Sequence, residues 1–208
     1  MNQKWLNKKD NKKLIVFFNG WGMDEKIVSH LLFEDYDVLM FNDYRILEID
    51  NYDFSKYIDK TLLAWSMGVF ICSKFYDTFK NFDRFIAING TQKPVDDNYG
   101  IPHIIYNLMV ENFNELTCDK FVRKISTGDN LREYCTRPMQ ELKEELIAIR
   151  DYKIDKHLKF DKVIISKKDR IMPPKNQRNY WLSQEIIPIE IESVHNVFEN
   201  YTKWSDLL

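Results

Sequence analysis

Glycine, proline and cysteine are scarce in this sequence, and each shortage excludes a class of protein. Only 6 glycines and 6 prolines occur in 208 residues, which excludes a collagen-like or low-complexity chain. The 3 cysteines, Cys72, Cys118 and Cys135, are odd in number and lack the spacing of a metal site. The 4 histidines are scattered, with no HxxxH or CxxC pattern. We therefore expect no metal, and free thiols in a reducing cytoplasm.

Basic excess and long apolar segments are missing as well. The chain has 30 Lys and Arg against 32 Asp and Glu, a formal net charge of -2, whereas nucleic-acid-binding domains usually have a basic excess. No stretch approaches the roughly 20 apolar residues that a membrane helix needs. No apolar run follows the N-terminal lysines, as it would in a secretory signal. We expect a cytoplasmic protein that binds neither nucleic acid nor membrane.

Short, continuous apolar runs recur along the chain, which is 44% hydrophobic. Runs of this length are typical of strands buried on both faces, and helical patterns lie between them, as at residues 67–79. Strands alternating with helices imply a parallel sheet covered by helices. We predict a compact α/β fold with a mostly parallel sheet of about six strands. The expected strands are residues 14–18, 37–41, 61–65, 85–88, 162–165 and 186–191.

One long segment, residues 92–159, interrupts this alternation. It has no strong strand signal, and helical patterns run from 103 to 125 and from 138 to 152. The segment is too long for a single crossover helix, which is the simpler alternative. We therefore predict one domain, 1–208, with a small helical lid inserted at about 92–159. Such a lid would lie over the carboxyl ends of the strands, where α/β proteins bind their ligands.

The stretch Ala-Trp-Ser-Met-Gly at 64–68 joins an expected strand directly to an expected helix. A serine at such a corner stands on a sharp turn, with its hydroxyl exposed above the sheet. The residues two before and two after it must be small because strand and helix pass close together, and Ala64 and Gly68 satisfy this. Ala64 departs from the usual glycine by one methyl group. The pattern predicts Ser66 as a nucleophile; the alternative is a packing turn of small residues.

A serine nucleophile needs a base and an acid that orients the base. In a fold of this kind the acid and the histidine follow the serine in that order. Asp169 follows the strand 162–165, and His195 follows 186–191, just before an expected terminal helix. Alone, each has a simpler interpretation, as a solvated charge or a surface histidine. Their joint order and position predict that both converge on Ser66. The histidines outside this pattern are His30, His103 and His157.

Two backbone amides are expected to stabilise the oxyanion of an ester in such a site. One is the amide of Met67, directly after the predicted nucleophile. The second is in the loop Asn-Gly-Trp-Gly-Met at 19–23, where two glycines around Trp21 let an amide turn inward. A phosphate-binding loop is a poor alternative, because neither GxGxxG nor GxxxxGK[ST] occurs in the sequence.

The loop 19–24, the elbow 63–69 and the Ile-Asn-Gly-Thr loop at 88–91 together resemble a known family. The chain is similar, over essentially its whole length, to the BioG-type pimeloyl-[acyl-carrier protein] methyl ester esterases of biotin synthesis, which are α/β-hydrolases. The resemblance implies hydrolysis of the methyl ester to the free acid and methanol, without metal or organic cofactor. It also implies the roles of single residues: Ser66 as nucleophile, His195 as base, Asp169 as acid, and Trp21 and Met67 as oxyanion-hole amides.

Such an esterase has acyl-carrier protein as its partner, and this partner is acidic. We therefore expect basic side chains of the insertion to dock it, with Arg123, Arg137 and Arg150 as first candidates. Interleaved acidic residues favour the alternative that these are ordinary solvated helix faces. Further basic residues of the insertion are Lys120, Lys124, Arg132 and Lys143.

Two other functions remain open from the sequence. A broad carboxylesterase or acyl thioesterase would use the same triad but would turn over free esters without a carrier protein. A hydrolase-like binding protein would have lost catalysis, which the intact Ser, Asp and His order argues against.

Overall fold

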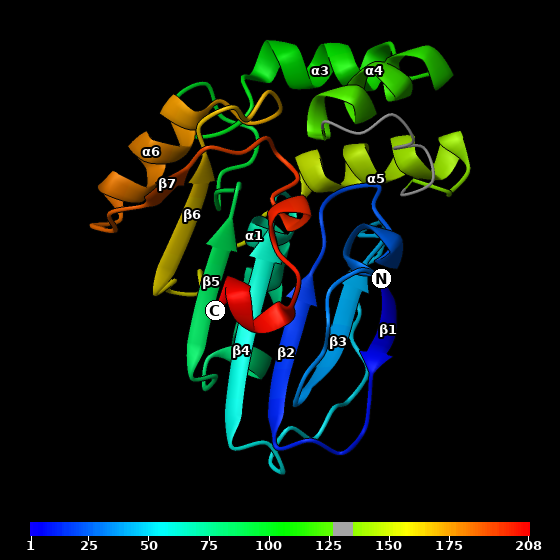
Figure 1. Ribbon diagram of the computed structural model, residues 1–208. Coiled ribbons are helices and arrows are strands. Elements are labelled where there is room, and N and C mark those ends of the chain that lie inside the picture. Colours follow the sequence, from blue (N-terminus) through cyan, green and yellow to red (C-terminus); the bar gives the residue numbers. More distant parts are fainter. Residues whose placement is uncertain (127–134) are drawn as a thin grey trace.

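Seven strands form one sheet in the order β1-β3-β2-β4-β5-β6-β7 in the computed structural model, which describes residues 1–126 and 135–208 (Figure 1). All neighbouring strands are parallel except β1 and β3, which are antiparallel. The predicted α/β fold is confirmed. The strands are β1 (Asn2–Asn7), β2 (Lys13–Phe18), β3 (Tyr36–Asn42), β4 (Asp59–Trp65), β5 (Arg84–Ile88), β6 (Lys162–Ser166) and β7 (Ile189–Ile191).

Every predicted strand is present, and the sheet has one more strand than expected. The additional strand, β1, is an edge strand whose residues alternate between exposed and half-buried from Asn2 to Trp5, and it has no continuous apolar run. The last predicted strand, 186–191, is shortened to β7, which begins directly after Pro188. Proline has no amide hydrogen for the ladder, and β7 is accordingly a short edge strand.

Burial on both faces explains the apolar runs, as β2 illustrates. Phe17 contacts Phe198 and Trp204 edge-on, with ring centroids 5.5 and 5.3 Å away. The next residue, Phe18, contacts Phe79 edge-on on the other face, at 5.6 Å. Since successive side chains of a strand point to opposite faces, a strand covered on both sides must be apolar at every position.

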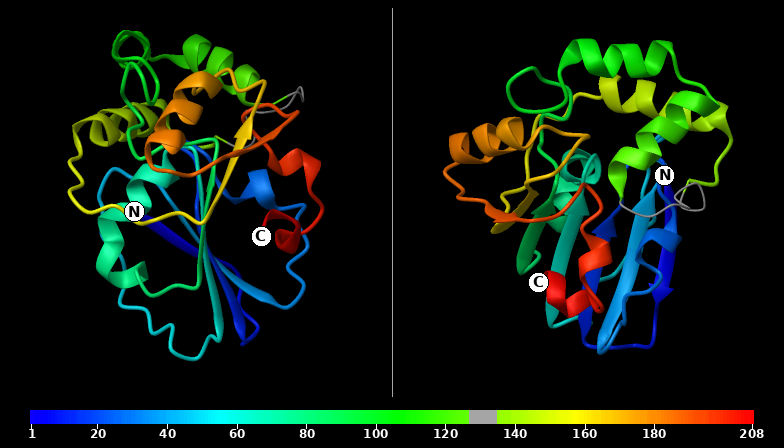
Figure 2. Two further views of the ribbon diagram at one scale, coloured as in Figure 1. Left: turned by 90° about the vertical axis from the view of Figure 1, so that its left-hand side faces the viewer. Right: turned by 45° about the horizontal axis from the view of Figure 1, so that its top comes forward.

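The layers that cover the two faces are made largely of short turns. The predicted helix 67–79 is broken into α1 (Gly68–Ile71), the 3₁₀ turn η2 (Cys72–Phe75) and α2 (Tyr76–Phe79). The other face carries the 3₁₀ turns η1 (Glu25–Val28), η4 (Phe198–Asn200) and η5 (Trp204–Leu207) (Figures 1 and 2). The prediction of a terminal helix after His195 is therefore wrong. Two 3₁₀ turns lie there instead, and their residues Phe198 and Trp204 pack against Phe17.

Three helices between β5 and β6 lie over the carboxyl ends of the parallel strands (Figures 1 and 2). They are α3 (His103–Glu111), α4 (Glu115–Ile125) and α5 (Met139–Asp151). The predicted pattern 103–125 is divided because Asn114 forms a capping box with Thr117 and starts α4 anew. A further helix, α6 (Pro174–Ser183), connects β6 to β7. Arg132 lies outside the described residues.

Within the described ranges, no helix combines the length and the apolar character needed to cross a membrane.

Candidate active site

Ser66 stands at a sharp turn between β4 and α1. Its φ angle of 56° is in the left-handed region that residues other than glycine rarely adopt. The turn brings α1 so close to β2 that a Cβ atom on Gly68 would lie 2.4 Å from the carbonyl oxygen of Phe18. Ala64 is fully buried in β4, so its additional methyl group is accommodated in the core. The predicted strand–serine–helix corner is therefore present in the structure.

The structure brings the predicted base and acid to this serine. The His195 Nε2 atom lies 2.9 Å from the Ser66 Oγ atom, and His195 Nδ1 lies 2.8 Å from Asp169 Oδ2. All three residues are buried, with 4% of Ser66, 6% of Asp169 and 1% of His195 exposed. An ionised carboxylate only accepts hydrogen bonds, so Nδ1 must carry the proton that it donates to Asp169. The Nε2 atom then accepts the hydroxyl proton of Ser66.

Asp169 is held by four donors. Its Oδ1 atom accepts from the backbone amides of Ile171 at 2.8 Å and Met172 at 3.0 Å. Its Oδ2 atom accepts from Gln177 Nε2 at 2.8 Å, in addition to His195. Gln177 is a fully buried residue of α6 that also donates to the carbonyl of Met172. The carboxylate is thus oriented by the loop after β6 and by the helix that follows.

The backbone of His195 is fixed by two side chains of neighbouring strands. Trp65 Nε1 donates to the carbonyl of His195 at 3.0 Å, and Asn89 Nδ2 donates to the same oxygen at 2.8 Å. Asn89 also joins β5 to β6, because it donates to Ser166 Oγ and accepts from the Ser166 amide at 2.7 Å. In the sequence, Asn89 stands out only as part of the Ile-Asn-Gly-Thr motif, and its position directly after a buried strand is the signal for this contact.

The loop after β2 and the turn of Ser66 enclose a small cavity. Trp21, Ser66, Met67 and His195 all line it, and its volume is about 10 Å³, room for about one water molecule. In residues 1–126 and 135–208, neither the Trp21 amide nor the Met67 amide donates a hydrogen bond to another protein atom. These two residues, whose amides have no protein acceptor in the described ranges, thus line the same cavity as Ser66.

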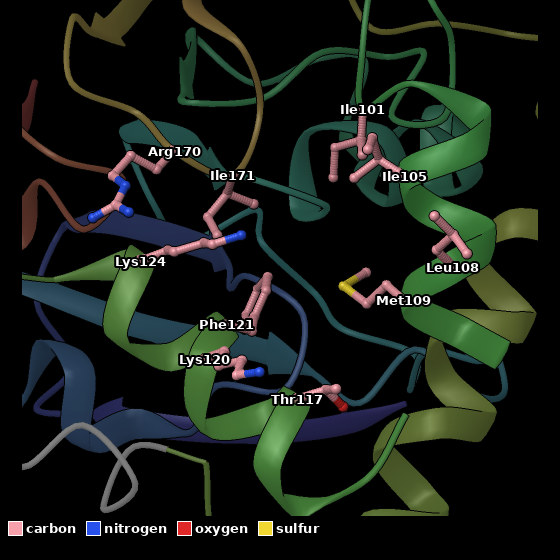
Figure 3. A pocket seen from close by; sticks show the side chains of 10 residues that line it. All are labelled: Ile101, Ile105, Leu108, Met109, Thr117, Lys120, Phe121, Lys124, Arg170 and Ile171. Atoms are coloured by element: carbon pink, nitrogen blue, oxygen red, sulfur yellow. The ribbon is translucent and has the colours of Figure 1, made fainter. Parts of the chain in front are cut away.

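A larger groove of about 260 Å³ opens between α3 and α4. In Figure 3, Met109 of α3 and Phe121 of α4 point into it from its two sides. These two residues and Ile171 also line the small cavity beside Ser66, so they separate that cavity from the groove. The remaining lining residues are Ile101, Ile105, Leu108, Thr117, Lys120, Lys124 and Arg170.

The three arginines expected to dock a carrier protein differ in their surroundings. Arg123 is exposed on α4, and Arg150 is exposed at the end of α5, where it pairs with Asp151 at 2.9 Å. Arg137 has only 16% of its side chain exposed and is ion-paired with Glu145 and with Asp43. A guanidinium held by two carboxylates is not available to a partner, so the expectation for Arg137 is corrected.

The other histidines lie away from Ser66. His30 Nε2 is 3.0 Å from the carbonyl of Phe198, and His103 pairs with Asp97 on the surface. Partial burial lowers the pKa of His157, which lines a separate surface pocket with Gln92. Across the described residues, no group of three or more His, Cys, Asp or Glu side chains has a metal-binding arrangement.

Comparisons with known proteins agree on one family. The family model of the pimeloyl-ACP methyl esterase BioG matches residues 1–207. A crystal structure of BioG from Haemophilus influenzae is 35% identical and superimposes with a TM-score of 0.87, covering 100% of this chain and 99% of that chain.

A longer relative and a more distant structure complete the comparison. A malonyl-[acyl-carrier protein] O-methyltransferase from Bacteroides fragilis is 40% identical over 179 residues, which are 82% of this chain and 36% of that protein. This chain thus spans about a third of that relative. An esterase from Exiguobacterium antarcticum, 16% identical with a TM-score of 0.67 over 95% of this chain and 89% of that one, has the same α/β-hydrolase fold.

Replacement of Gly68 by alanine tests the tight corner. The new Cβ atom would meet the backbone of β2 at 2.4 Å, and backbone cannot move aside as a flexible side chain can. We expect Gly68→Ala to lower the free energy of unfolding by about 1–3 kcal/mol, measured by urea denaturation, and to reduce esterase activity. Thr78→Ala, an exposed change on α2, is the control and should unfold like the wild type. A fully stable Gly68→Ala protein would contradict the tight approach of α1 to β2.

Proposed function

The chain belongs to the BioG family of pimeloyl-ACP methyl esterases, and we propose that Ser66, His195 and Asp169 are the catalytic triad with which it hydrolyses its ester. The overall reaction converts the methyl ester of pimeloyl-[acyl-carrier protein] and water into the free acid and methanol, in biotin synthesis. The observation that carries the proposal is the chain of two hydrogen bonds, 2.9 and 2.8 Å, through the imidazole of His195.

Acylation begins when Ser66 Oγ attacks the ester carbonyl and His195 Nε2 takes its proton. Asp169 stabilises the imidazolium that forms, because its carboxylate already accepts the Nδ1 proton. The tetrahedral intermediate then collapses, the bond to methoxide breaks, and His195 returns the proton so that methanol leaves. The acyl group remains on Ser66.

Deacylation repeats these steps with water. His195 removes a proton from a water molecule, the hydroxide attacks the acyl-enzyme, and the pimeloyl carboxylic acid is released as Ser66 regains its proton. In both halves the negative oxygen needs preorganised donors. We assign this role to the amides of Trp21 and Met67, because both line the small cavity that also contains Ser66.

We propose that α3, α4 and α5 act as a lid and that the groove between α3 and α4 receives the acyl chain. Its lining is apolar toward Ser66, as suits the methylene chain of a pimeloyl group. Lys120, Lys124 and Arg170 are the basic residues among those that line it, and their side chains suit an acidic carrier protein that stays outside. Arg123 and Arg150 are the further docking candidates, since both are exposed.

Removal of the nucleophile tests the triad directly. We expect Ser66→Ala to reduce kcat by about 10⁴-fold or more, since only binding and the oxyanion donors would remain. The measurement is release of methanol from pimeloyl-[acyl-carrier protein] methyl ester. Circular dichroism and thermal melting should match the wild type, because alanine fits the buried site. Turnover near the wild-type rate in a folded Ser66→Ala protein would show that Ser66 is not the nucleophile.

The base and the acid have separate expectations. His195→Ala should be about as damaging as Ser66→Ala, whereas His30→Ala and His103→Ala should retain activity.

Asp169→Asn should lower kcat by about 10³- to 10⁴-fold with little change in KM, because an amide donor would turn the imidazole into the wrong tautomer. Asp155→Asn, an exposed change, is the control. If Asp169→Asn changed KM alone, Asp169 would not be the acid of the triad.

Carrier docking is tested with two substrates. Arg123→Glu/Arg150→Glu should lower kcat/KM for the carrier-bound ester at least tenfold, and raised salt should weaken the wild type in the same way. A small free methyl ester should react at the wild-type rate. The charge-matched control is Lys9→Glu/Lys12→Glu, whose exposed side chains lie near the opposite end of the sheet. Equal losses on both substrates would reject docking and indicate a disturbed lid.

A further inference from the structure

Glu145 is a fully buried carboxylate that the ester-hydrolysis mechanism does not use. It lies in α5, and its two oxygens contact two loops at the carboxyl edge of the sheet. Oε1 accepts from the Tyr44 amide at 2.8 Å, in the loop after β3. Oε2 accepts from the Gly22 amide at 3.3 Å, in the loop after β2, and pairs with Arg137. One side chain therefore joins α5 to the loop that contains Trp21.

The charge of Glu145 is balanced within the protein. Burial raises the pKa of its carboxyl group, and the guanidinium of Arg137 acts in the opposite direction. Arg137 also has its Nη1 atom 2.8 Å from Asp43 Oδ1. A buried ion pair is costly unless its remaining donors and acceptors are satisfied, and apolar residues of similar size often stabilise a fold equally well. The charged Glu145 side chain is therefore best explained by the backbone amides that its carboxylate binds, those of Gly22 and Tyr44.

The loop that it holds is attached to α5 at two successive residues. Trp21 Nε1 donates to the carbonyl of Leu142 at 3.0 Å, and the next residue, Gly22, donates its amide to Glu145. Gly22 has a φ angle of 76°, which turns the chain sharply after Trp21. Leu142 and Glu145 are one turn apart on the same helix. The Trp21 amide is thus followed directly by two contacts to α5, one through the indole of Trp21 itself and one through the Gly22 amide, and these contacts orient the backbone at Trp21.

We propose that Glu145, paired with Arg137, is a positioning residue for the oxyanion hole. Its carboxylate fixes the Gly22 amide and thereby directs the Trp21 amide toward the oxygen that becomes negative during attack by Ser66. The inference rests on the proposed function, in which the Trp21 amide is an oxyanion donor. Removal of one such donor costs about 10²- to 10³-fold in kcat in a serine hydrolase, so loss of its orientation should cost somewhat less.

The test removes the carboxylate without leaving an unpaired cation. In Glu145→Met/Arg137→Met both buried charges are replaced by unbranched apolar chains, and the Gly22 and Tyr44 amides lose their acceptor. We expect a folded protein in which kcat for a free methyl ester falls about 10- to 100-fold while KM changes less than threefold. The matched control is Asp59→Met/Arg84→Met, an ion pair at the amino ends of β4 and β5, which should keep the wild-type kcat.

A pair of inhibitors separates positioning from stability. A trifluoromethyl ketone analogue of the substrate adds to Ser66 as an anionic tetrahedral adduct, whereas the matching methyl ketone binds as a neutral ground state. Loss of the Trp21 amide should weaken the trifluoromethyl ketone by the factor seen in kcat and leave the methyl ketone unchanged. Simple destabilisation would weaken both equally, and that result would overturn the proposal.

Two further measurements keep the outcome decisive. Ser66→Ala is assayed in parallel: an active Ser66→Ala enzyme contradicts the proposed function, whereas an inactive one together with a fully active Glu145→Met/Arg137→Met enzyme contradicts only the role of Glu145. Should the double variant fail to fold, Glu145→Gln retains the shape and one acceptor oxygen. It should lower kcat and trifluoromethyl ketone affinity together by at least threefold, and unchanged values for both would reject the proposal.

Discussion

The left-handed backbone conformation of Ser66 is strained, and packing of the surrounding sheet must stabilise it. Ser66 follows β4, which has β2 and β5 as its parallel neighbours, so the strained residue sits at the centre of the sheet rather than at an edge. Two glycines allow the chain to close around it. A Cβ atom on Gly68 would overlap the backbone of β2, and one on Gly90 would lie 2.3 Å from the Ser66 carbonyl oxygen. Strain of about 1–3 kcal/mol persists only where such packing determines the backbone completely.

Parallel pairing then brings the other polar groups to the same edge. Asp169 follows β6 and His195 follows β7, and each lies in a loop whose start is set by the end of its strand. Asn89, after β5, spans the gap between these loops through hydrogen bonds to Ser166 and to the carbonyl of His195. The three residues of the proposed triad, distant in sequence, are thus brought together by hydrogen bonds among strand ends, and the four donors to Asp169 then orient its carboxylate.

The sequence predicted the parts of this arrangement that depend on short-range patterns. Continuous apolar runs identified the central strands, and small residues around Ser66 identified the turn. The edge strand β1 was missed because only two of its residues, Trp5 and Leu6, are apolar, so it has no apolar run. Arg137 was misinterpreted as a docking residue because a charge in a helical region gives no sign of burial; its partners, Asp43 and Glu145, are revealed only by packing. Gln177 was missed because a polar residue in a helical region likewise gives no sign of burial, although its partner Asp169 lies only eight residues earlier, in the loop before α6.

The proposed lid is attached by hydrogen bonds to the loops of the candidate site, more firmly than a separate cover would be. The Asn196 amide donates to the carbonyl of Ile125 at the end of α4, at 2.8 Å, and α5 accepts from both Trp21 and Gly22. Movement of α4 or α5 away from the sheet would break these bonds, each worth about 1 kcal/mol or more when its partner remains buried. Rotation of the Met109 and Phe121 side chains would break none of the three. In the proposed function, an acyl chain would therefore reach Ser66 at a lower free-energy cost through side-chain rearrangement between the groove and the small cavity than through opening of the whole helical layer.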